Sequence, residues 1–142
     1  MKRIAAAALI LAAGFLTAGT AMAQSHTVTA SIPFAFSLNG RTLPAGHYII
    51  ESDFNTPDVL RIEDRQDSVY VVAMARHGAD ESQQNNTLAF HRYGNQYFLT
   101  TIRANGGSMN CHFTPSKEEK WAKAQTQDAS LRLDNDVMIP LE

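Results

Sequence analysis

The sequence predicts one all-β domain, an antiparallel two-sheet sandwich with one short C-terminal helix. Short stretches alternate apolar and polar residues, which is typical of strands with one buried face. Turn residues such as Asn-Gly and Gly-Asn separate them at intervals of about eight to twelve residues, as in sandwiches and barrels. Only near residue 116 does a helical period replace this pattern. Alternation does not distinguish a sandwich from a small β-barrel, so a barrel remains the alternative.

The first 23 residues predict a signal peptide that is removed on export. Residues 2–3 (Lys-Arg) are basic, residues 4–16 form an apolar run, and residues 21–23 (Ala-Met-Ala) match a cleavage site. Cleavage after Ala23 leaves a single β-rich domain, residues 24–142, in the periplasm or outside the cell. The apolar run is short and interrupted, so we expect no stable membrane anchor. Losing the two cations changes the net charge from −2 to −4, and no basic patch remains for nucleic acid.

The start of the mature chain predicts a strand that ends in a tight hairpin. Apolar residues alternate with small or polar ones over residues 28–38, and Asn39-Gly40 then suits a type I′ turn. After a turn or bulge at residues 44–46 (Pro-Ala-Gly), the second strand resumes at Tyr48. Pairing across the hairpin places Leu38, Phe36 and Phe34 opposite Arg41, Leu43 and Ala45.

The middle of the chain predicts two more strands and two loops. Residues 53–58 are rich in turn residues and predict a loop, and residues 59–63 predict a strand. Residues 68–75 are apolar on both faces, so we expect them in the middle of a sheet, covered on each side. The polar stretch 76–86 has no apolar anchor and predicts a loop.

Residues 87–92 and 96–103 predict a second hairpin. Gly94-Asn95 between them suits a type II′ turn. The hairpin places Phe90 and Arg92 opposite Leu99 and Tyr97. A further strand is expected over residues 108–113.

One helix is predicted at about residues 116–125. Ser116 and Glu119 have the spacing of a capping box at its start, and we expect Trp121 and Ala124 to dock on the sheet. Two strand candidates follow, at 129–133 and 137–141, and Pro140 places the second at an edge or in a loose end. The expected core consists of Val28, Ile32, Phe34, Phe36, Leu43, Tyr48, Ile50, Leu60, Ile62, Val71, Phe90, Leu99 and Ile102.

Two segments and the helix resemble an uncharacterised family of small exported bacterial β-proteins. The segments are IPFAFSLNGRTLPAGHYII and LAFHRYGNQYFLTTI, and the helix is SKEEKWAKA. The family carries an I-P-F-x-F…L-P-A-G-x-Y segment and an H-R-Y-G-x-x-Y-F-L segment. The resemblance covers roughly residues 28–125 and rests on structural motifs. It implies export and a β-rich fold, and it implies no activity.

Enzyme signatures are absent from the sequence. It contains no G-x-S-x-G, H-E-x-x-H, P-loop, G-x-G-x-x-G or C-x-x-C, so we expect no enzyme and no catalytic residues. Cys111 and His112 cannot form a thiol–imidazole pair, because neighbouring strand residues point to opposite faces. Cys111 has no internal disulfide partner, so it is buried, free and reactive, or an intermolecular link. Burial in a strand is the interpretation that we favour.

The mature N-terminus offers one candidate metal site. Cleavage after Ala23 leaves Gln24-Ser25-His26. Its α-amine, two backbone amides and the His26 imidazole could close a square-planar set of four nitrogens, which Cu(II) and Ni(II) prefer. An N-terminal Gln also cyclises readily, which removes the amine ligand. The remaining histidines have no ligand spacing, so we expect no other cofactor.

We therefore expect an exported non-catalytic protein that acts by binding or in an envelope structure. His91, Arg92 and Tyr93 form the candidate interaction surface, for a protein, a glycan or a small apolar ligand. Two alternatives remain: a carrier of a small apolar ligand in a barrel cavity, and a hydrolase with an unrecognised site. An interior cavity of about 300 Å³ or more, lined by the even-numbered residues of the first strand, would favour the carrier. A filled interior would favour an interaction module.

Overall fold

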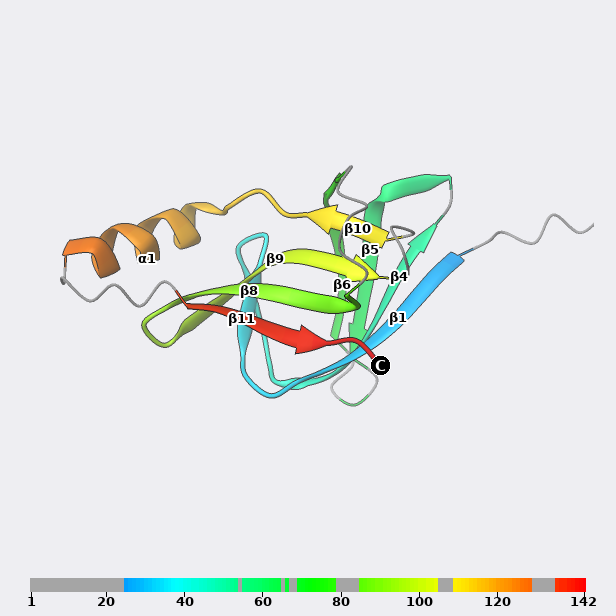
Figure 1. Ribbon diagram of the computed structural model, residues 1–142, viewed down its shortest axis with the longest axis horizontal. Helices are drawn as coiled ribbons and strands as arrows, with labels where there is room; N and C mark the ends of the chain where they lie inside the picture. Colours follow the sequence, from blue (N-terminus) through cyan, green and yellow to red (C-terminus); the bar gives the residue numbers. More distant parts are fainter. Residues whose placement is uncertain are drawn as a thin grey trace, which may run out of the picture.

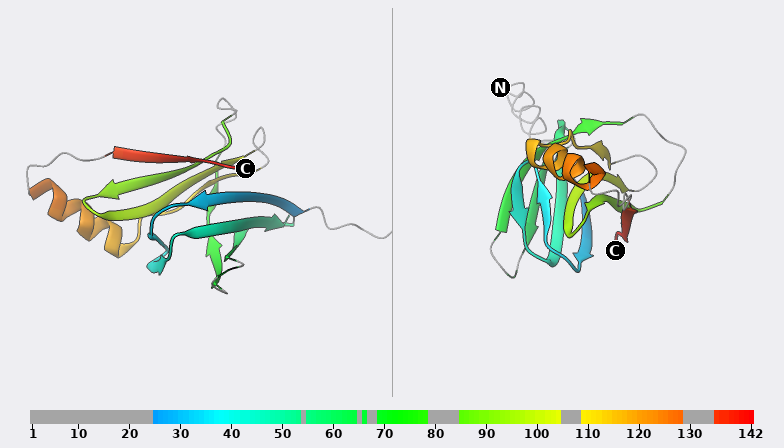
Figure 2. Two further views of the ribbon diagram at one scale, coloured as in Figure 1. Left: turned by 90° about the horizontal axis from the view of Figure 1, so that it is seen from below. Right: turned by 90° about the vertical axis from the view of Figure 1, so that its left-hand side faces the viewer.

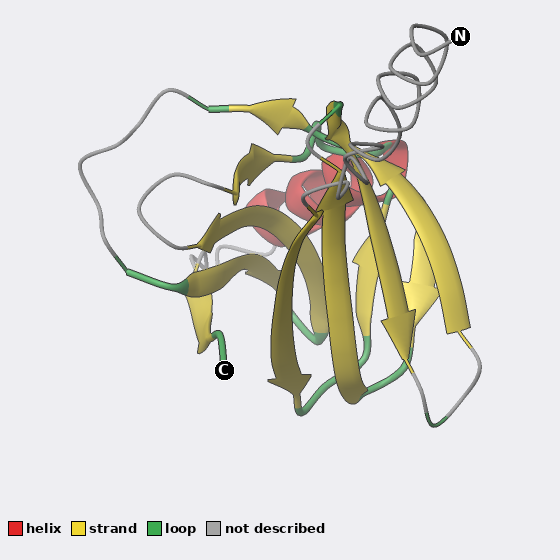
Figure 3. Cartoon of the chain, turned by 90° about the vertical axis from the view of Figure 1, so that its right-hand side faces the viewer, coloured by secondary structure: helices red, strands yellow, loops and turns green. Residues whose placement is uncertain are grey.

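The computed structural model describes residues 25–53, 55–64, 66, 69–78, 85–104, 109–128 and 135–142, which form two facing sheets and one helix (Figures 1 and 3). Sheet A has the order β1-β4-β5-β6, with β1 Ser25–Ile32, β4 Gly46–Asp53, β5 Thr56–Asp64 and β6 Val69–Met74. Sheet B has the order β11-β8-β9-β10-β7, with β11 Asn135–Pro140, β8 Thr87–Tyr93, β9 Gln96–Ala104, β10 Met109–His112 and β7 Arg76–His77. The hairpin of β2 (Phe36–Leu38) and β3 (Arg41–Leu43) joins β9 through Ser37 and Phe98. The helix α1, Lys117–Asp128, lies at one end. The predicted sandwich with one short helix is confirmed.

The strand predicted over residues 28–38 is divided between the two sheets. β1 ends at Ile32 and pairs with β4, whereas β2 begins at Phe36 and belongs to sheet B. The prediction of one strand is wrong because Pro33 has no N–H for the ladder, so pairing stops and the chain crosses over. Every second side chain still points toward the core on both sides of the break. Ile32 and Phe36 are buried, and Phe34 between them is partly buried against the core.

The Asn39-Gly40 hairpin has the predicted geometry. The φ angle is 49° at Asn39 and 79° at Gly40, and a type I′ turn requires positive φ at both positions. The predicted pair of Phe34 and Ala45 does not form, because Gly46 pairs with Ile32 of β1 instead. The predicted pairs of Leu38 with Arg41 and of Phe36 with Leu43 are confirmed.

Residues 68–75 were expected in the middle of a sheet, and this prediction is wrong. β6 is the last strand of sheet A and pairs with β5 alone among the described strands. Its outward side chains Tyr70, Val72 and Met74 are 56%, 53% and 74% exposed. The outer face of β6 is therefore apolar and exposed, because no described layer lies over it.

Two predicted loops are partly strand. β5 begins at Thr56, so the loop predicted over 53–58 shortens to a tight turn in which the Asn55 N–H donates to the Asp53 carboxylate at 2.9 Å. The first two residues of the loop predicted over 76–86 form β7, which pairs with β10. Residues 79–84 lie outside the described residues.

The second hairpin keeps its predicted register at the turn and then bends. Phe90 lies opposite Leu99 and Arg92 opposite Tyr97, as predicted. Only Gly94 of the two turn residues has positive φ, at 60°, as a type II′ turn requires. The register then shifts between Ala89 and Phe90, and the bulged Thr100 donates its hydroxyl to the Ala89 carbonyl at 3.0 Å. Bulges increase the local twist, in keeping with the curl of sheet B (Figure 3).

The last residues connect the two sheets on one side. β11 is the edge of sheet B, as Pro140 predicted, and pairs with β8. Beyond it the Leu141 N–H donates to the Asn86 carbonyl and the Glu142 N–H to the Thr29 carbonyl of β1, at 3.0 and 2.9 Å. Figure 1 shows the C-terminus beside β1. The candidate strand 129–133 lies outside the described residues.

The predicted core is confirmed, with Phe34 partly rather than fully buried. Leu88 and Met109 are not among the residues of the predicted core, and they are also fully buried. Cys111 is 1% exposed, as expected of a buried strand residue. Burial, and secondarily the charge of Asp58, raises the pKa of its thiol to about 11.

Candidate binding groove

Helix α1 is fixed at its N-terminus by half of the predicted capping box. The Ser116 hydroxyl accepts a hydrogen bond from the Glu119 N–H at 3.2 Å, and the Ser116 carbonyl accepts from the Lys120 N–H at 3.1 Å. In a complete capping box the Glu119 side chain would return to Ser116. Instead, its carboxylate reaches His91 of β8, so the same residue that starts the helix also ties it to sheet B.

The helix docks through a different face from the one predicted. Ala122 is buried against Tyr93 and Phe98, whereas Trp121 is 72% exposed. Ala124 is exposed as well, so the expected docking of Trp121 and Ala124 is wrong. Glu119 contacts His91, and the small Ala122 lies three residues later on the same face of the helix. This face therefore packs on the sheet. The largest apolar side chain of α1 therefore points away from the core.

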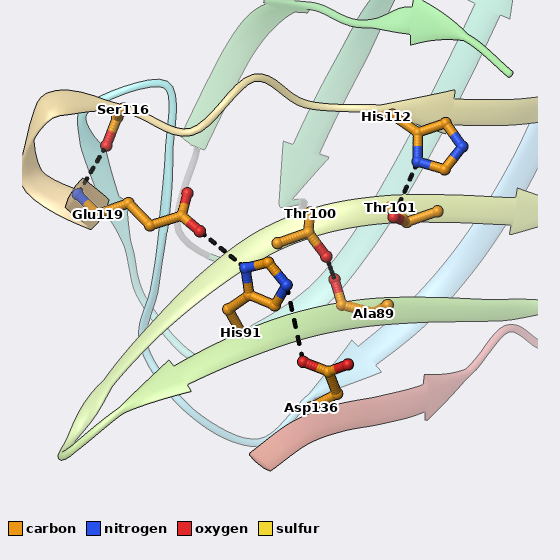
Figure 4. A network of polar contacts seen from close by, with 8 residues as sticks. All are labelled: Ala89, His91, Thr100, Thr101, His112, Ser116, Glu119 and Asp136. Carbon is orange, nitrogen blue, oxygen red and sulfur yellow. Dashed lines mark hydrogen bonds and ion pairs between the residues drawn. The ribbon is translucent and has the colours of Figure 1, made fainter. Parts of the chain in front are cut away.

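The link between α1 and sheet B is a polar network centred on His91 (Figure 4). Its Nδ1 lies 2.8 Å from an oxygen of the buried Glu119, and its Nε2 lies 3.7 Å from the exposed Asp136 of β11. His91 thus joins β8, α1 and β11. Neither ring nitrogen faces a hydroxyl or thiol nucleophile, because both face carboxylates.

The structure places the three residues of the predicted interaction surface in different surroundings. His91 belongs to the network below α1. Arg92 donates from Nε to the Gly94 carbonyl at 2.9 Å and lies over the Tyr97 ring. Tyr93 is buried beneath the helix. His91 and Tyr93 therefore contact the helix, and Arg92 contacts the turn of the β8–β9 hairpin.

A groove of about 600 Å³ opens between α1, the β2–β3 hairpin and the β8–β9 turn. These elements lie together at one end of the sandwich (Figure 2). Lys117, Trp121 and Gln125 lie on one stripe of the helix, since residues four apart share a helix face. We call this space the α1 groove; it is lined by Ala35, Phe36, Ser37, Thr42, Asn95, Gln96, Tyr97, Phe98, Lys117, Glu118, Trp121, Ala122 and Gln125.

One end of the α1 groove is built from stacked rings. Tyr97 lies parallel to Phe34, with ring centroids 4.0 Å apart, and the Arg92 guanidinium lies 5.6 Å from the Tyr97 centroid. Phe34 meets Phe90 of the core edge to face. Through Phe34, the Tyr97 wall of the groove is therefore connected to the core.

The predicted interaction surface contributes no residue to the groove, because His91, Arg92 and Tyr93 are absent from its lining. Ser37 and Tyr97, which do line it, belong to the predicted strands of the two hairpins. Trp121 was expected on the sheet instead. A signal for its exposure was present in the helix itself, because Lys117 and Gln125 are polar and lie one turn before and after it.

The predicted metal residue, His26, lies in β1 and is partly exposed. Its register partner is Ser52, and Ser25 is paired with Asp53, while Gln24 lies outside the described residues. Within the described part of the chain, no group of three or more His, Cys, Asp or Glu residues could hold a metal ion. The described residues also contain no helix of the length and hydropathy needed to cross a membrane.

Cys111 and His112 point to opposite faces of β10, as the alternation predicted. Cys111 is in the core, and His112 Nδ1 lies 3.2 Å from the Thr101 hydroxyl on the other face (Figure 4). Met109 shares the buried face with Cys111. Both sulfur atoms therefore belong to side chains that fill the core.

Comparisons with protein families, with curated proteins and with solved structures found no match. The geometry and chemistry of the α1 groove are therefore the basis for a functional proposal.

Proposed function

We propose that this protein is an exported, non-catalytic binding module that holds its ligand in the α1 groove. The observation that supports this is the position of Trp121. It is 72% exposed on a helix that is anchored through Glu119 and Ala122 on another face. A large aromatic side chain in water, inside a groove of about 600 Å³, is typical of a ligand site, since such sites measure about 300–1,000 Å³.

The carrier and hydrolase alternatives receive less support. The inward residues of β1 and β2 are packed in the core cluster, whereas the α1 groove is open at the surface. A carrier would need an enclosed apolar space along those residues. A hydrolase of the Ser–His–Asp type needs a nucleophile beside the imidazole, and both ring nitrogens of His91 face carboxylates.

Export is proposed from the N-terminal sequence and is supported by the resemblance to exported bacterial β-proteins. The expected mature chain begins at Gln24. Expression of the full chain in a Gram-negative host, followed by fractionation and intact mass, checks this directly. Recovery of the uncleaved chain in the cytosol, with residues 1–23 retained, would contradict export.

The experiment that tests the groove uses Trp121, which is the only tryptophan in the chain. A library of small neutral metabolites, sugars and short peptides is screened against the mature protein by tryptophan fluorescence and by amide chemical shifts. We expect hits whose shifts map to α1, the β2–β3 hairpin and the β8–β9 turn.

The matched control is Tyr70→Ala, which removes another exposed aromatic residue on the far edge of sheet A. Hits should be lost in Trp121→Ala and kept in Tyr70→Ala. If no compound of any class shifts the groove residues, the proposed function is wrong.

A further inference from the structure

From the same groove we propose the ligand class: a neutral saccharide whose ring stacks on Trp121 and whose hydroxyls are bound by the surrounding amides. This inference rests on the proposed function and deepens it. A pyranose ring offers a flat face of C–H groups and a rim of hydroxyls. Its recognition therefore requires an exposed aromatic plane beside groups that both donate and accept hydrogen bonds.

The α1 groove supplies the aromatic plane. Trp121 is 72% exposed, and the residues on either side of it along the helix stripe, Lys117 and Gln125, are long and polar. The indole ring of Trp121 therefore presents a broad apolar surface to the groove. An aromatic ring that serves only for packing is usually buried in so small a domain.

The groove also supplies the matching polar groups. Asn95 and Gln96 come from the β8–β9 turn, Gln125 from α1, and Ser37 and Thr42 from the β2–β3 hairpin. Each of these side chains carries both a donor and an acceptor, as a sugar hydroxyl does. None of the five makes a side-chain hydrogen bond to another described residue, so all five are available to a ligand.

The charges of the groove favour a neutral ligand over an ionic one. Its lining includes one cation, Lys117, and one anion, Glu118, which are adjacent at the start of the helix. These two charges cancel over the groove. An anionic saccharide or a phosphate would be expected to meet a cluster of cations instead.

The same inventory supports binding without hydrolysis. Glycoside hydrolysis generally uses two carboxylic groups on either side of the bond, and Glu118 is the sole carboxylate in the lining of the groove. Hydrogen bonds from its own backbone N–H and from the Ser116 hydroxyl lower the pKa of the Glu118 carboxyl. It would therefore be ionised near neutral pH and unable to donate a proton to a leaving group.

The test is a titration of the mature protein with neutral hexasaccharides of the chitin, cellulose and starch types, to about 10 mM because stacking on one open ring gives weak binding. The acyclic polyol sorbitol, a set of neutral hexapeptides and a polyuronic acid serve as comparisons. Binding is followed by Trp121 fluorescence, amide chemical shifts and calorimetry. We expect at least one hexasaccharide to bind at the groove, and sorbitol to have no effect.

Variants assign the roles of the residues. Trp121→Ala should weaken the binding at least tenfold, and Trp121→Phe should weaken it less because a smaller aromatic face remains. Gln125→Ala should also weaken it, whereas Lys120→Ala and Tyr70→Ala, which lie outside the groove, should leave it unchanged. Calorimetry is the readout for the Trp121 variants, since they lose the fluorescent side chain.

The outcomes separate the two proposals. If the peptides or the polyuronic acid bind at the groove and no neutral saccharide does, the saccharide assignment is overturned and the binding module stands. If a saccharide binds equally well to Trp121→Ala, the stacking mechanism is overturned. If no compound shifts the groove residues, both proposals fail.

Discussion

Replacing Gly46 with any larger residue is expected to destabilise the fold, because the Asp64 carboxylate lies against this position. A Cβ built at this position would overlap the Oδ2 of Asp64 and lie 3.2 Å from its Cγ. Asp64 is 1% exposed, and its Oδ1 accepts the Gln66 N–H at 2.9 Å. The carboxylate therefore cannot swing away without breaking this hydrogen bond.

The size of the effect follows from these contacts. Overpacking a core position typically costs about 1–3 kcal/mol. Disturbing the hydrogen bond to this buried carboxylate adds about 1–3 kcal/mol, with overlap between the two contributions. We therefore expect Gly46→Ala to lower the free energy of unfolding by about 2–4 kcal/mol. For a domain of this size the melting midpoint should fall by about 10 °C.

Urea unfolding followed by tryptophan fluorescence and circular dichroism measures this loss. Gly94→Ala is the contrasting control: Gly94 has a positive φ, 60°, which Gly46 does not, but a Cβ there meets no atom within 4 Å, so only backbone strain is introduced. It should cost only about 1 kcal/mol. In an Asp64→Ala background the cost of Gly46→Ala should shrink below about 1 kcal/mol. An equal cost in both backgrounds would refute the proposed overlap with Asp64.

Three further predictions concern stability and association. Burial raises the pKa of the Cys111 thiol from 9.0 to about 11 in the folded state. The contribution of the buried thiol to the free energy of unfolding should therefore be fully present below about pH 9. It should decline as the pH rises from 9 through 11, by about 1.4 kcal/mol for each pH unit. The decline should be weaker in Cys111→Ala, and a thiol reagent should label native Cys111 only after unfolding; rapid labelling would contradict its burial. Gly40→Val should cost about 1–2 kcal/mol or more, because φ is 79° there and a β-branched residue resists it; an unchanged urea midpoint would contradict the type I′ turn. Val72→Lys on the exposed edge strand β6 should reduce self-association at high concentration, measured by light scattering, without lowering stability; increased association would contradict the edge assignment.

Local patterns predicted the parts of the fold that are determined by neighbouring residues. Asn39-Gly40 and Gly94-Asn95 predicted the two turns and the register next to each turn, because positive φ at a turn is a property of the turn residues themselves. The same patterns failed where tertiary context decides. Residues 69–74 are apolar on both faces, and no local rule says whether a second layer covers them.

The α1 groove could not be predicted from the sequence for a related reason. Its lining comes from three separate segments, and the crossover at Pro33 together with the pairing of Ser37 with Phe98 places the β2–β3 hairpin against the end of β9. The orientation of the helix depends on contacts between residues far apart in the sequence: Glu119 with His91, 28 positions away, and Ala122 with Tyr93 and Phe98. A helix with so few apolar residues carries a weak pattern, so Trp121 was placed on the wrong face.

The contact of Glu142 with β1 has a kinetic consequence. Its N–H donates to the Thr29 carbonyl across 113 positions of sequence, so this bond can form only when β1 and the C-terminal residues are both in place. Contacts of such long range are expected late in folding and contribute to slow folding in β-rich proteins. Removing residues 141–142 should therefore accelerate unfolding while leaving the refolding rate nearly unchanged. Stopped-flow unfolding and refolding in urea would separate the two rates.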